Sequence, residues 1–230
     1  MTNKLKYLVL GLTIIVAGCK VHNRQPSPVT SIFQADLDSQ IHENMPGILA
    51  TVISKEKKID WSGASGYADK INKTKLLPHQ TFRIASVTKT FVAATVLRLW
   101  EDGKLKLEDP IVKYISSEHT EILKKGGYDP QAITIFHLLT HSSGMAEHTG
   151  SEKYQMAYLK TNHHWTRTEQ LQDLITYTKP AGEIGQQFSY SDSGYILLGE
   201  IIETITRQSL GEAMKEQLSL KKLGLKSRSE

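Results

Sequence analysis

The sequence predicts an α/β (α+β) fold in which an antiparallel hairpin is accompanied by several packed helices. Two strand-like runs, 48–54 and 58–67, are joined by a lysine-rich turn, as expected of a hairpin. Helical patterns occupy much of the remaining chain, and the one that begins near Ser86 is the most apolar. The expected domain, 31–230, holds roughly 200 residues, enough for one substantial core but not comfortably for two.

Each element has its own signal in the sequence. An amphipathic helix is expected over 31–43, because Phe33, Leu37 and Ile41 recur every four residues, and Pro46-Gly47 then breaks the pattern. The helix that follows Ser86 ends at Gly103. The polar stretch 146–165 is expected to be a surface excursion. Further helices are predicted over 109–115, 133–139, 169–177 and 191–206.

The first 18 residues have the pattern of a secretory signal. A basic head precedes an apolar run of about ten residues, which is too short to span a bilayer as a helix. The junction Val16-Ala-Gly-Cys19 resembles the bacterial lipobox, whose cysteine is acylated; the alternative is an ordinary signal peptide with an incidental cysteine. Cys19 is the only cysteine, so no internal disulfide can form.

These features predict a lipoprotein signal peptide over 1–18, lipidation at Cys19, a linker over 19–30 and a domain over 31–230. The expected location is the cell envelope, on the periplasmic or extracellular face, with the lipid as the membrane contact. Lys20 after the cysteine is compatible with an outer-membrane site. Removal of 1–18 lowers the net charge from +4 to +2, and no basic patch remains that would favour nucleic acid as a partner.

Ser86 and Lys89 are the first candidate catalytic pair. Residues three apart on a helix share a face, so the hydroxyl and the amine can touch. Serine needs a neighbouring base to become a good nucleophile, and lysine becomes that base when its pKa falls through burial or the positive end of a helix dipole. The pair therefore predicts an acyl-transfer enzyme.

The same Ser-x-x-Lys spacing occurs twice more, at Ser54/Lys57 and Ser219/Lys222. The first copy lies where a strand runs into a charged turn, and the second where a polar helix ends. Both are interpreted as surface coincidences. Only Ser86 opens a helix whose apolar side chains cover most of the circumference, which predicts a buried central helix. These side chains are Phe91, Val92, Val96, Leu97 and Trp100.

Four blocks of residues, in a fixed order, carry a family resemblance. They are Phe82-Arg-Ile-Ala-Ser86-Val-Thr-Lys89, Leu107-Glu-Asp-Pro110, Ile133-Thr-Ile-Phe-His-Leu-Leu-Thr-His-Ser-Ser-Gly144 and Phe188-Ser-Tyr190-Ser-Asp192-Ser-Gly. Together they resemble the serine β-lactamase and D-alanyl-D-alanine carboxypeptidase superfamily, in its class C β-lactamase-related branch. The resemblance implies a β-lactamase/transpeptidase-like fold, with helices packed on an antiparallel sheet and an all-helical lobe over about 100–185.

The resemblance also implies a mechanism and a substrate class. Ser86 would be the acylated nucleophile, Lys89 the proton acceptor, and Tyr190 the group that passes the proton to the leaving group. The backbone N–H of Ser86 would supply half of an oxyanion hole. The implied substrates are D-amino-acid peptides, β-lactams or esters, and the implied chemistry needs no cofactor or metal.

The sequence departs from the family pattern at Asp192, where the common motif has asparagine. A carboxylate cannot donate the hydrogen bond that an amide offers to a substrate carbonyl, but it can accept one from Lys89. Asp192 is therefore a candidate substrate-binding residue that favours peptide or ester hydrolysis over β-lactam binding.

A second departure is that the family's Lys-Thr-Gly or His-Thr-Gly motif, which follows the tyrosine block, is not found there. His148-Thr-Gly150 has the right letters but precedes Tyr190, so it is interpreted as part of a polar loop. The expectation is a C-terminally truncated member that lacks the closing strands and is therefore weakly active and poorly stable.

Two other function classes compete with the hydrolase. The first is a non-catalytic or degenerate lipoprotein that keeps the fold as a binding module. The second is a metal enzyme, since His137 and His141 are spaced to share one helix face and His163-His164 could add ligands. Tyr67-Ala-Asp69 repeats the Tyr-x-Asp spacing but is interpreted as structural.

Overall fold

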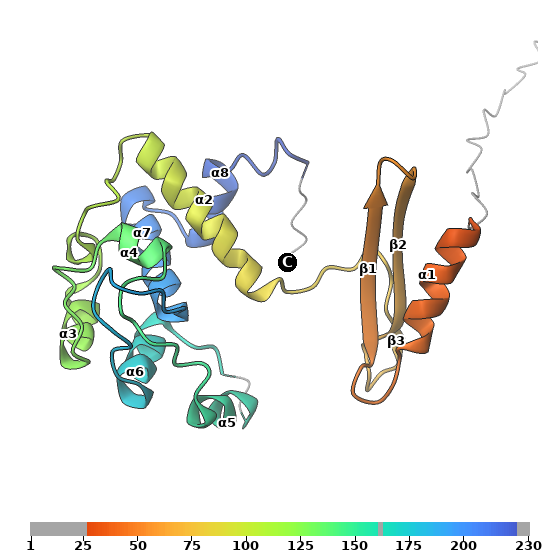
Figure 1. Ribbon diagram of the computed structural model, residues 1–230, viewed down its shortest axis with the longest axis horizontal. Helices are drawn as coiled ribbons and strands as arrows, with labels where there is room; N and C mark the ends of the chain where they lie inside the picture. Colours follow the sequence, from red (N-terminus) through yellow and green to blue (C-terminus); the bar gives the residue numbers. More distant parts are fainter. Residues whose placement is uncertain (1–26, 161–162, 225–230) are drawn as a thin grey trace, which may run out of the picture. The chain divides into compact units, whose positions relative to one another are not determined.

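The computed structural model describes residues 27–160 and 163–224 (Figure 1). The predicted leader, Cys19 and most of the 19–30 linker lie outside these residues. The chain divides into two compact units, Met1–Phe82 and Arg83–Glu230. No helix in the described part of the chain is long and apolar enough to cross a membrane.

From residue 27, where the described part begins, the first unit is a small antiparallel sheet with one helix. Its elements are α1 (Pro28–Ser39), β1 (Gly47–Ser54), β2 (Ile59–Asp69) and β3 (Thr74–Lys75), with the strands in the order β1-β2-β3. The expected hairpin is confirmed, in a register that runs from Gly47 opposite Gly66 to Ser54 opposite Ile59. The sequence missed β3, because two residues are too few to show a periodic pattern.

Helix α1 packs against β2 within this unit. The rings of Phe33 and Trp61 lie 5.3 Å apart, and Gln34 Nε2 donates to the carbonyl of Ala64 at 3.0 Å. The helix begins three residues earlier than expected, because the Ser27 hydroxyl caps it by accepting the Thr30 N–H. The structure therefore places the end of the predicted linker inside the helix.

The described part of the second unit is helical, which confirms the expected helical lobe and extends it on both sides. Its elements are the 3₁₀ turn η1 (Ala85–Val87), α2 (Thr88–Glu101), the 3₁₀ turn η2 (Ile111–Lys113), α3 (Ser117–Lys125), α4 (Ile135–Leu139), α5 (Glu152–Lys160), α6 (Arg167–Tyr177), α7 (Asp192–Thr206) and α8 (Leu210–Gln217). Figure 1 shows α2 as a long helix near the N-terminal end of this unit.

Helix α7 lies at the centre of the core and contacts α2, α4, α6 and α8. Its side chains Leu197, Leu198, Ile201 and Ile202 are fully buried. Their spacing of three and four residues gives the helix one continuous apolar face. The N-terminus of this helix carries Asp192, so the packing of α7 determines where that carboxylate lies.

Helix α2 is buried on one face rather than around its circumference, which corrects the sequence-based expectation. Val92, Thr95, Val96 and Leu99 are buried. Leu97 and Trp100, by contrast, are 42% and 47% exposed. The helix is therefore amphipathic within the second unit, because α7 and α8 cover only the side that faces them.

The expectation that segment 146–165 is a surface excursion is also corrected, because part of it is buried. His148 is completely buried, Tyr154 is 8% exposed, and residues from Glu152 form α5. Polar composition is a poor guide here, because buried polar side chains are tolerated where they find hydrogen-bond partners. The partners of this segment lie at the start of α7.

A buried polar network ties α3, α6 and α7 together. His119 Nδ1 lies 2.7 Å from Glu200 Oε2, and His119 Nε2 lies 3.0 Å from Thr168 Oγ1. The other carboxylate oxygen of Glu200 accepts the Ser116 N–H at 2.9 Å. A network satisfied in this way specifies one packing of the three helices, because any alternative would leave a buried group unpaired.

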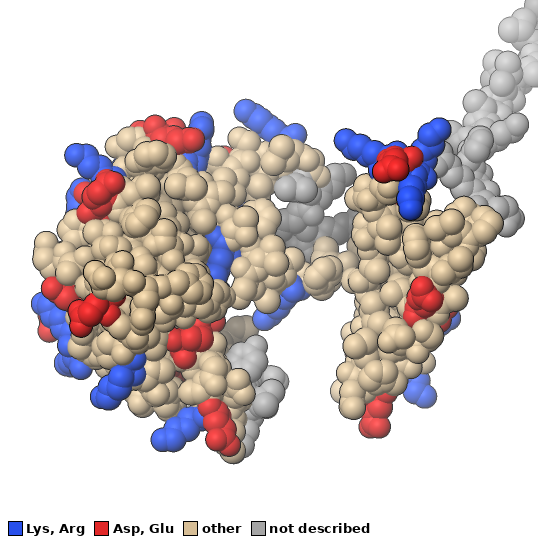
Figure 2. All heavy atoms as spheres, viewed as in Figure 1, with Lys and Arg blue, Asp and Glu red and all other residues tan. Residues whose placement is uncertain are grey.

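Charged side chains are distributed differently on the two units. Acidic and basic side chains are mixed on the face of the helical unit that Figure 2 shows. Lysines and one glutamate gather at the turn between β1 and β2, where residues 55–58 are exposed (Figure 2). The lysine-rich turn that the sequence placed there is confirmed.

Candidate active site

Ser86 and Lys89 meet at the start of α2. Ser86 lies in the 3₁₀ turn and Lys89 is the second residue of the helix, so both point to the same side. Lys89 Nζ donates to Ser86 Oγ at 3.2 Å. The preceding residue, Ala85, has a left-handed backbone with φ 45°, which is uncommon for residues other than glycine. Backbone strain of this kind tends to occur at functional sites.

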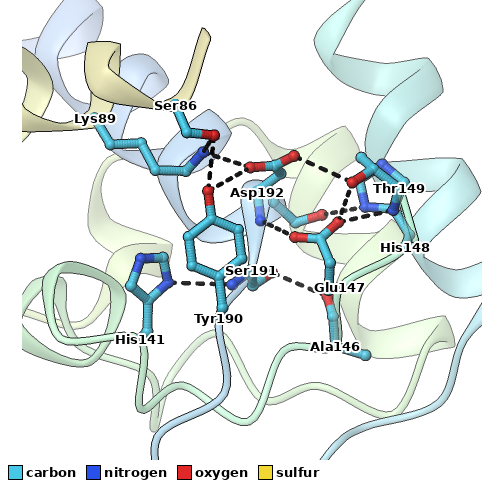
Figure 3. Close-up of polar contacts among 11 residues, drawn as sticks. Ser86, Lys89, His141, Ala146, Glu147, His148, Thr149, Tyr190, Ser191 and Asp192 are labelled. Carbon is cyan, nitrogen blue, oxygen red and sulfur yellow. Dashed lines mark hydrogen bonds and ion pairs between the residues drawn. The ribbon is translucent and has the colours of Figure 1, made fainter.

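Tyr190 and Asp192 reach the same point from the start of α7 (Figure 3). The Tyr190 hydroxyl donates to Ser86 Oγ at 2.9 Å and lies 3.3 Å from Asp192 Oδ1. Asp192 Oδ1 also forms an ion pair with Lys89 Nζ. The structure therefore brings together the four residues for which the sequence predicted catalysis or substrate binding.

The charge state of Lys89 differs from the one expected. Burial alone would lower the pKa of Lys89, but the hydrogen bonds and negative charge of Asp192, together with Tyr190, outweigh it and raise the pKa above its ordinary value. The ammonium also lies 4.9 Å from the ring centroid of Tyr190 and 5.8 Å from that of Tyr195. Lys89 is a cation in this arrangement, because it has a carboxylate partner.

A loop over residues 141–149 holds the start of α7 in place. Ser189 N–H donates to the carbonyl of His141 at 2.7 Å, and Ser191 N–H donates to its Nδ1 at 3.1 Å. The Ser191 hydroxyl donates to the carbonyl of Ala146 at 3.0 Å. The backbone of the segment that carries Tyr190 and Asp192 is therefore anchored by the 141–149 loop, from residues on both sides of Tyr190.

His141 also orients the tyrosine. Its ring stacks on Tyr190, with centroids 4.6 Å apart and an interplanar angle of 28°. Burial, and then the charge of Lys89, lower the pKa of His141, so its imidazole is neutral and Nδ1 is free to accept the Ser191 N–H. Local packing, rather than metal binding, explains this histidine.

Glu147 and Thr149 are site residues that the sequence analysis missed. Glu147 Oε2 accepts the Asp192 N–H at 2.8 Å, and Oε1 accepts the Thr149 N–H at 2.7 Å. The Thr149 hydroxyl lies 2.6 Å from Glu147 Oε1 and 3.3 Å from Asp192 Oδ2 (Figure 3). No local sequence pattern predicts the contacts of Glu147 and Thr149 with Asp192, since they join segments more than forty residues apart.

His148-Thr-Gly150 does not act as one motif in the structure. His148 is completely buried, and its Nδ1 lies 3.2 Å from Ser193 Oγ. Burial lowers the pKa of His148. Only Thr149 of this stretch contacts a predicted site residue.

The other sequence candidates are engaged elsewhere. His137 completes a capping box with Thr134 at the start of α4, and His163 lies 2.9 Å from Glu169. Within the described ranges, no group of three or more His, Cys, Asp or Glu side chains could hold a metal ion. Asp69, in the first unit, accepts the backbone N–H groups of its own turn.

The two additional Ser-x-x-Lys copies have local backbone roles. The Lys57 backbone N–H donates to the Ser54 hydroxyl at 3.2 Å, which closes the hairpin turn. The Lys222 N–H donates to the Ser219 carbonyl at 2.8 Å. In both copies it is the lysine backbone that contacts the serine, whereas at Ser86 it is the lysine side chain.

A pocket of about 550 Å³ opens beside Ser86 within the helical unit. Ser86, Lys89 and Asp192 line one part of it, and Trp165, Ile196 and Leu210 contribute apolar surface. A volume of this size with a few convergent polar groups suits a small organic molecule or a peptide fragment.

Comparison with known proteins identifies the family to which this chain belongs. The Beta-lactamase family model matches residues 29–227. Protein flp of Staphylococcus aureus is 30% identical over 190 residues, which are 83% of this chain and 35% of that protein. Penicillin-binding protein 4* of Bacillus subtilis is 28% identical over 160 residues, which are 67% of this chain and 32% of that protein. The chain thus spans about a third of the length of these relatives.

Solved structures agree with the family match. A D-stereospecific amidohydrolase from Streptomyces sp. is 25% identical with a TM-score of 0.67, over 85% of this chain and 54% of that one. The D-amino acid amidase from Ochrobactrum anthropi SV3, complexed with L-phenylalanine amide, is 26% identical with a TM-score of 0.65, over 86% and 51% of the two chains. The chain belongs to the Beta-lactamase family and has its β-lactamase/transpeptidase-like α+β fold.

Proposed function

We propose that this protein is a serine hydrolase that forms an acyl-enzyme on Ser86. The observation that carries the proposal is that Ser86 Oγ lies within hydrogen-bond distance of two proton-transfer groups, Lys89 Nζ at 3.2 Å and the Tyr190 hydroxyl at 2.9 Å. A hydroxyl held in this way can lose its proton as it attacks a carbonyl. The bond between the carbonyl carbon and the leaving amine or alcohol then breaks, the leaving group takes up the proton, and water hydrolyses the ester formed on Ser86.

The charge on Lys89 assigns different tasks to the two groups. As an ammonium, Lys89 cannot accept the Ser86 proton, but it can stabilise negative charge that develops on Ser86 or Tyr190. Lys89 becomes a base only after it has lost its own proton. The rate of acylation should therefore rise with pH if Lys89 is the acceptor, and it should be less dependent on this ionisation if Tyr190 accepts the proton.

The substrates that we propose are amides or esters, including peptides and amides of D-amino acids. Two of the similar structures are named as a D-stereospecific amidohydrolase and a D-amino acid amidase. Asp192 adds a chemical reason, since its carboxylate accepts a hydrogen bond from Lys89 and offers none to a substrate carbonyl. We place β-lactams behind amides and esters for that reason.

A non-catalytic role is the second candidate. The Lys89–Asp192 ion pair favours it, because a lysine held as a cation is a poor general base. In that case the pocket beside Ser86 would bind a ligand without turnover.

Covalent labelling separates the two candidates. The chain would be incubated with a fluorophosphonate, and the adduct located by intact mass and peptide mapping. The hydrolase proposal expects one adduct, on Ser86, that is lost in Ser86→Ala and kept in the matched variants Ser54→Ala and Ser219→Ala. An unlabelled Ser86 at every pH between 6 and 10 would support the binding role instead.

We also propose that the protein is attached to the cell envelope by a lipid on Cys19. The support for this proposal is the Val16-Ala-Gly-Cys19 junction. A hydrolase of envelope peptides or esters would then act where such substrates occur.

A further inference from the structure

We propose that the Thr149 hydroxyl is a shared hydrogen-bond donor that alternates between the carboxylates of Glu147 and Asp192, and that it thereby sets how firmly Asp192 holds the Lys89 proton. Thr149 and Glu147 are then positioning residues, since they act on Ser86 only through Asp192 and Lys89. The inference rests on the function proposed above for this site.

The geometry limits the hydroxyl to one acceptor at a time. Thr149 Oγ1 lies 2.6 Å from Glu147 Oε1 and 3.3 Å from Asp192 Oδ2. A hydroxyl has a single proton to donate. The shorter contact places that proton on the Glu147 side in the structure, and a rotation about the Cβ–Oγ bond would redirect it to Asp192.

Glu147 is held in place independently of this hydroxyl. Its two oxygens accept backbone N–H groups, from Asp192 at 2.8 Å and from Thr149 at 2.7 Å. Ser191, the residue before α7, makes no side-chain cap hydrogen bond, so Glu147 takes over part of the capping of that helix. The loop therefore stays anchored when the Thr149 hydroxyl is removed, and only the donor between the carboxylates is lost.

The two carboxylate oxygens of Asp192 have different partners. Oδ1 contacts Lys89 Nζ and the Tyr190 hydroxyl, whereas Oδ2 contacts Thr149. A donor on Oδ2 withdraws charge from the carboxylate and weakens its hold on the Lys89 proton. With the hydroxyl turned to Glu147, Asp192 is the stronger acceptor and Lys89 stays charged.

The groups that act on Lys89 come from α7, from Tyr190 just before it and from the 141–149 loop. Tyr190 precedes α7, Asp192 and Tyr195 lie on α7, and His141 comes from the 141–149 loop. Burial and the charge of Lys89 lower the pKa of His141, which is therefore neutral, and burial raises the pKa of Tyr195. Asp192 is thus the partner whose strength decides the protonation of Lys89.

The test is to follow the Lys89 side chain by NMR in the 230-residue chain, with its signal assigned by loss in Lys89→Arg. Thr149→Val removes the hydroxyl and keeps the shape, so Asp192 becomes the stronger acceptor. Because the hydroxyl is held mainly toward Glu147, Asp192 loses only a fraction of a hydrogen bond, and we expect the Lys89 titration to move upward by about 0.2–0.5 pH unit, less than the ordinary effect of one full hydrogen bond. Thr149→Ser keeps the hydroxyl and should titrate like the parent.

Thr176→Val is the matched control, because it removes a hydroxyl that donates to its own helix, to the carbonyl of Gln172. It should leave Lys89 unchanged. The inference is overturned if Thr149→Val titrates like the parent, or if Thr149→Ser shifts Lys89 as far as Thr149→Val does. If the valine variant does not fold, as judged by circular dichroism, Thr149→Ala replaces it with the same expected direction.

The rate of Ser86 labelling by the fluorophosphonate gives a second, separate readout. Its rise with pH should move upward in Thr149→Val together with the Lys89 titration. An unreactive Ser86 in the parent would refute the proposed hydrolase while leaving the NMR titration to decide the role of Thr149. A reactive Ser86 with an unmoved titration would refute the role of Thr149 alone.

Discussion

Lys89 of α2 and Asp192 of α7 form an ion pair across 103 positions of the sequence, and each also contacts a hydroxyl of the Ser86–Tyr190 pair. The two side chains are only 17% and 28% exposed, so solvent screens their attraction weakly. This pair decides the charge at the proposed nucleophile. It also makes the protonation of Lys89 the most informative quantity to measure.

Replacement of the groups that touch Ser86 should slow its acylation. Lys89→Ala and Tyr190→Phe should each reduce the rate of labelling by about a hundredfold or more, the usual effect of losing a positioned proton-transfer group. Stopped-flow or quenched labelling with an activated ester would measure it. A Tyr190→Phe variant that acylates at the parental rate would exclude Tyr190 from proton transfer.

Asp192→Asn should lower the pKa of Lys89. Burial disfavours the ammonium, and the substitution removes the carboxylate that outweighs burial. The pH at which Ser86 labelling rises should therefore move down, and acylation by a β-lactam should improve because the amide can donate to a carbonyl. The matched control is Asp109→Asn, which removes the carboxylate partner of the exposed Lys113 more than eighty residues from Asp192 in the sequence. An unchanged or higher pH midpoint in Asp192→Asn would contradict the assigned role.

The same ion pair gives a signed prediction for stability. Since the pKa of Lys89 is raised in the folded chain, its contribution is fully present below the unfolded value near 10.5 and is lost as the pH rises through the folded value. Urea unfolding should show a loss above about pH 10 that Lys89→Met lacks. A parental curve and a Lys89→Met curve that stay parallel from pH 8 to 11 would refute it.

Gly144→Ala should destabilise the helical unit strongly. Gly144 has φ 75°, and an added Cβ would lie 2.3 Å from the carbonyl oxygen of Gly182. Gly103→Ala is the matched control, since Gly103 has φ 68° but nothing within 4 Å of its added Cβ. Both variants bear the cost of a left-handed alanine, about 1 kcal/mol, and only Gly144→Ala adds a steric clash. Equal losses in denaturant unfolding would show that the loop relaxes around the new methyl group.

The buried contact between His119 and Glu200 should matter for stability more than an exposed pair does. Glu200→Ala leaves His119 Nδ1 and the Ser116 N–H without their acceptor, at a cost of about 1–3 kcal/mol for each buried group. Glu121→Ala, which removes the exposed pair with Lys124, should cost about 0–1 kcal/mol. Thermal unfolding of the two variants would check this order, and comparable midpoints would contradict it.

Cys19→Ser should release the protein from the membrane fraction or leave it unprocessed. The lipobox-like junction motivates this expectation, and acylation requires the thiol. Fractionation and metabolic labelling with a palmitate analogue would measure it. A mutant that fractionates and migrates like the parent would remove the support for a lipid anchor.

The sequence by itself determined the hairpin, most of the helices and the family, because these depend on local periodicity and on short motifs. Ser86 and Lys89 could be paired from a spacing of three residues on one helix, and the structure places their polar atoms 3.2 Å apart. Tyr190 and Asp192 came from the family motif, and α7 brings both to Ser86. The two-residue strand β3 could not be predicted, since it is too short to show a periodic pattern.

Tertiary structure alone decided the charge of Lys89 and the roles of Glu147 and Thr149. The sequence around Lys89 shows only burial and a helix start, both of which lower its pKa. The carboxylate that raises the pKa of Lys89 comes from α7, which is distant in the sequence. The polar composition of residues 146–165 indicated a surface excursion, but the side chains of residues 147–149 contact the start of α7, more than forty residues away in the sequence. Hydrogen bonds and charges act over a few ångströms of space rather than of sequence, so only the packed chain shows which groups they join.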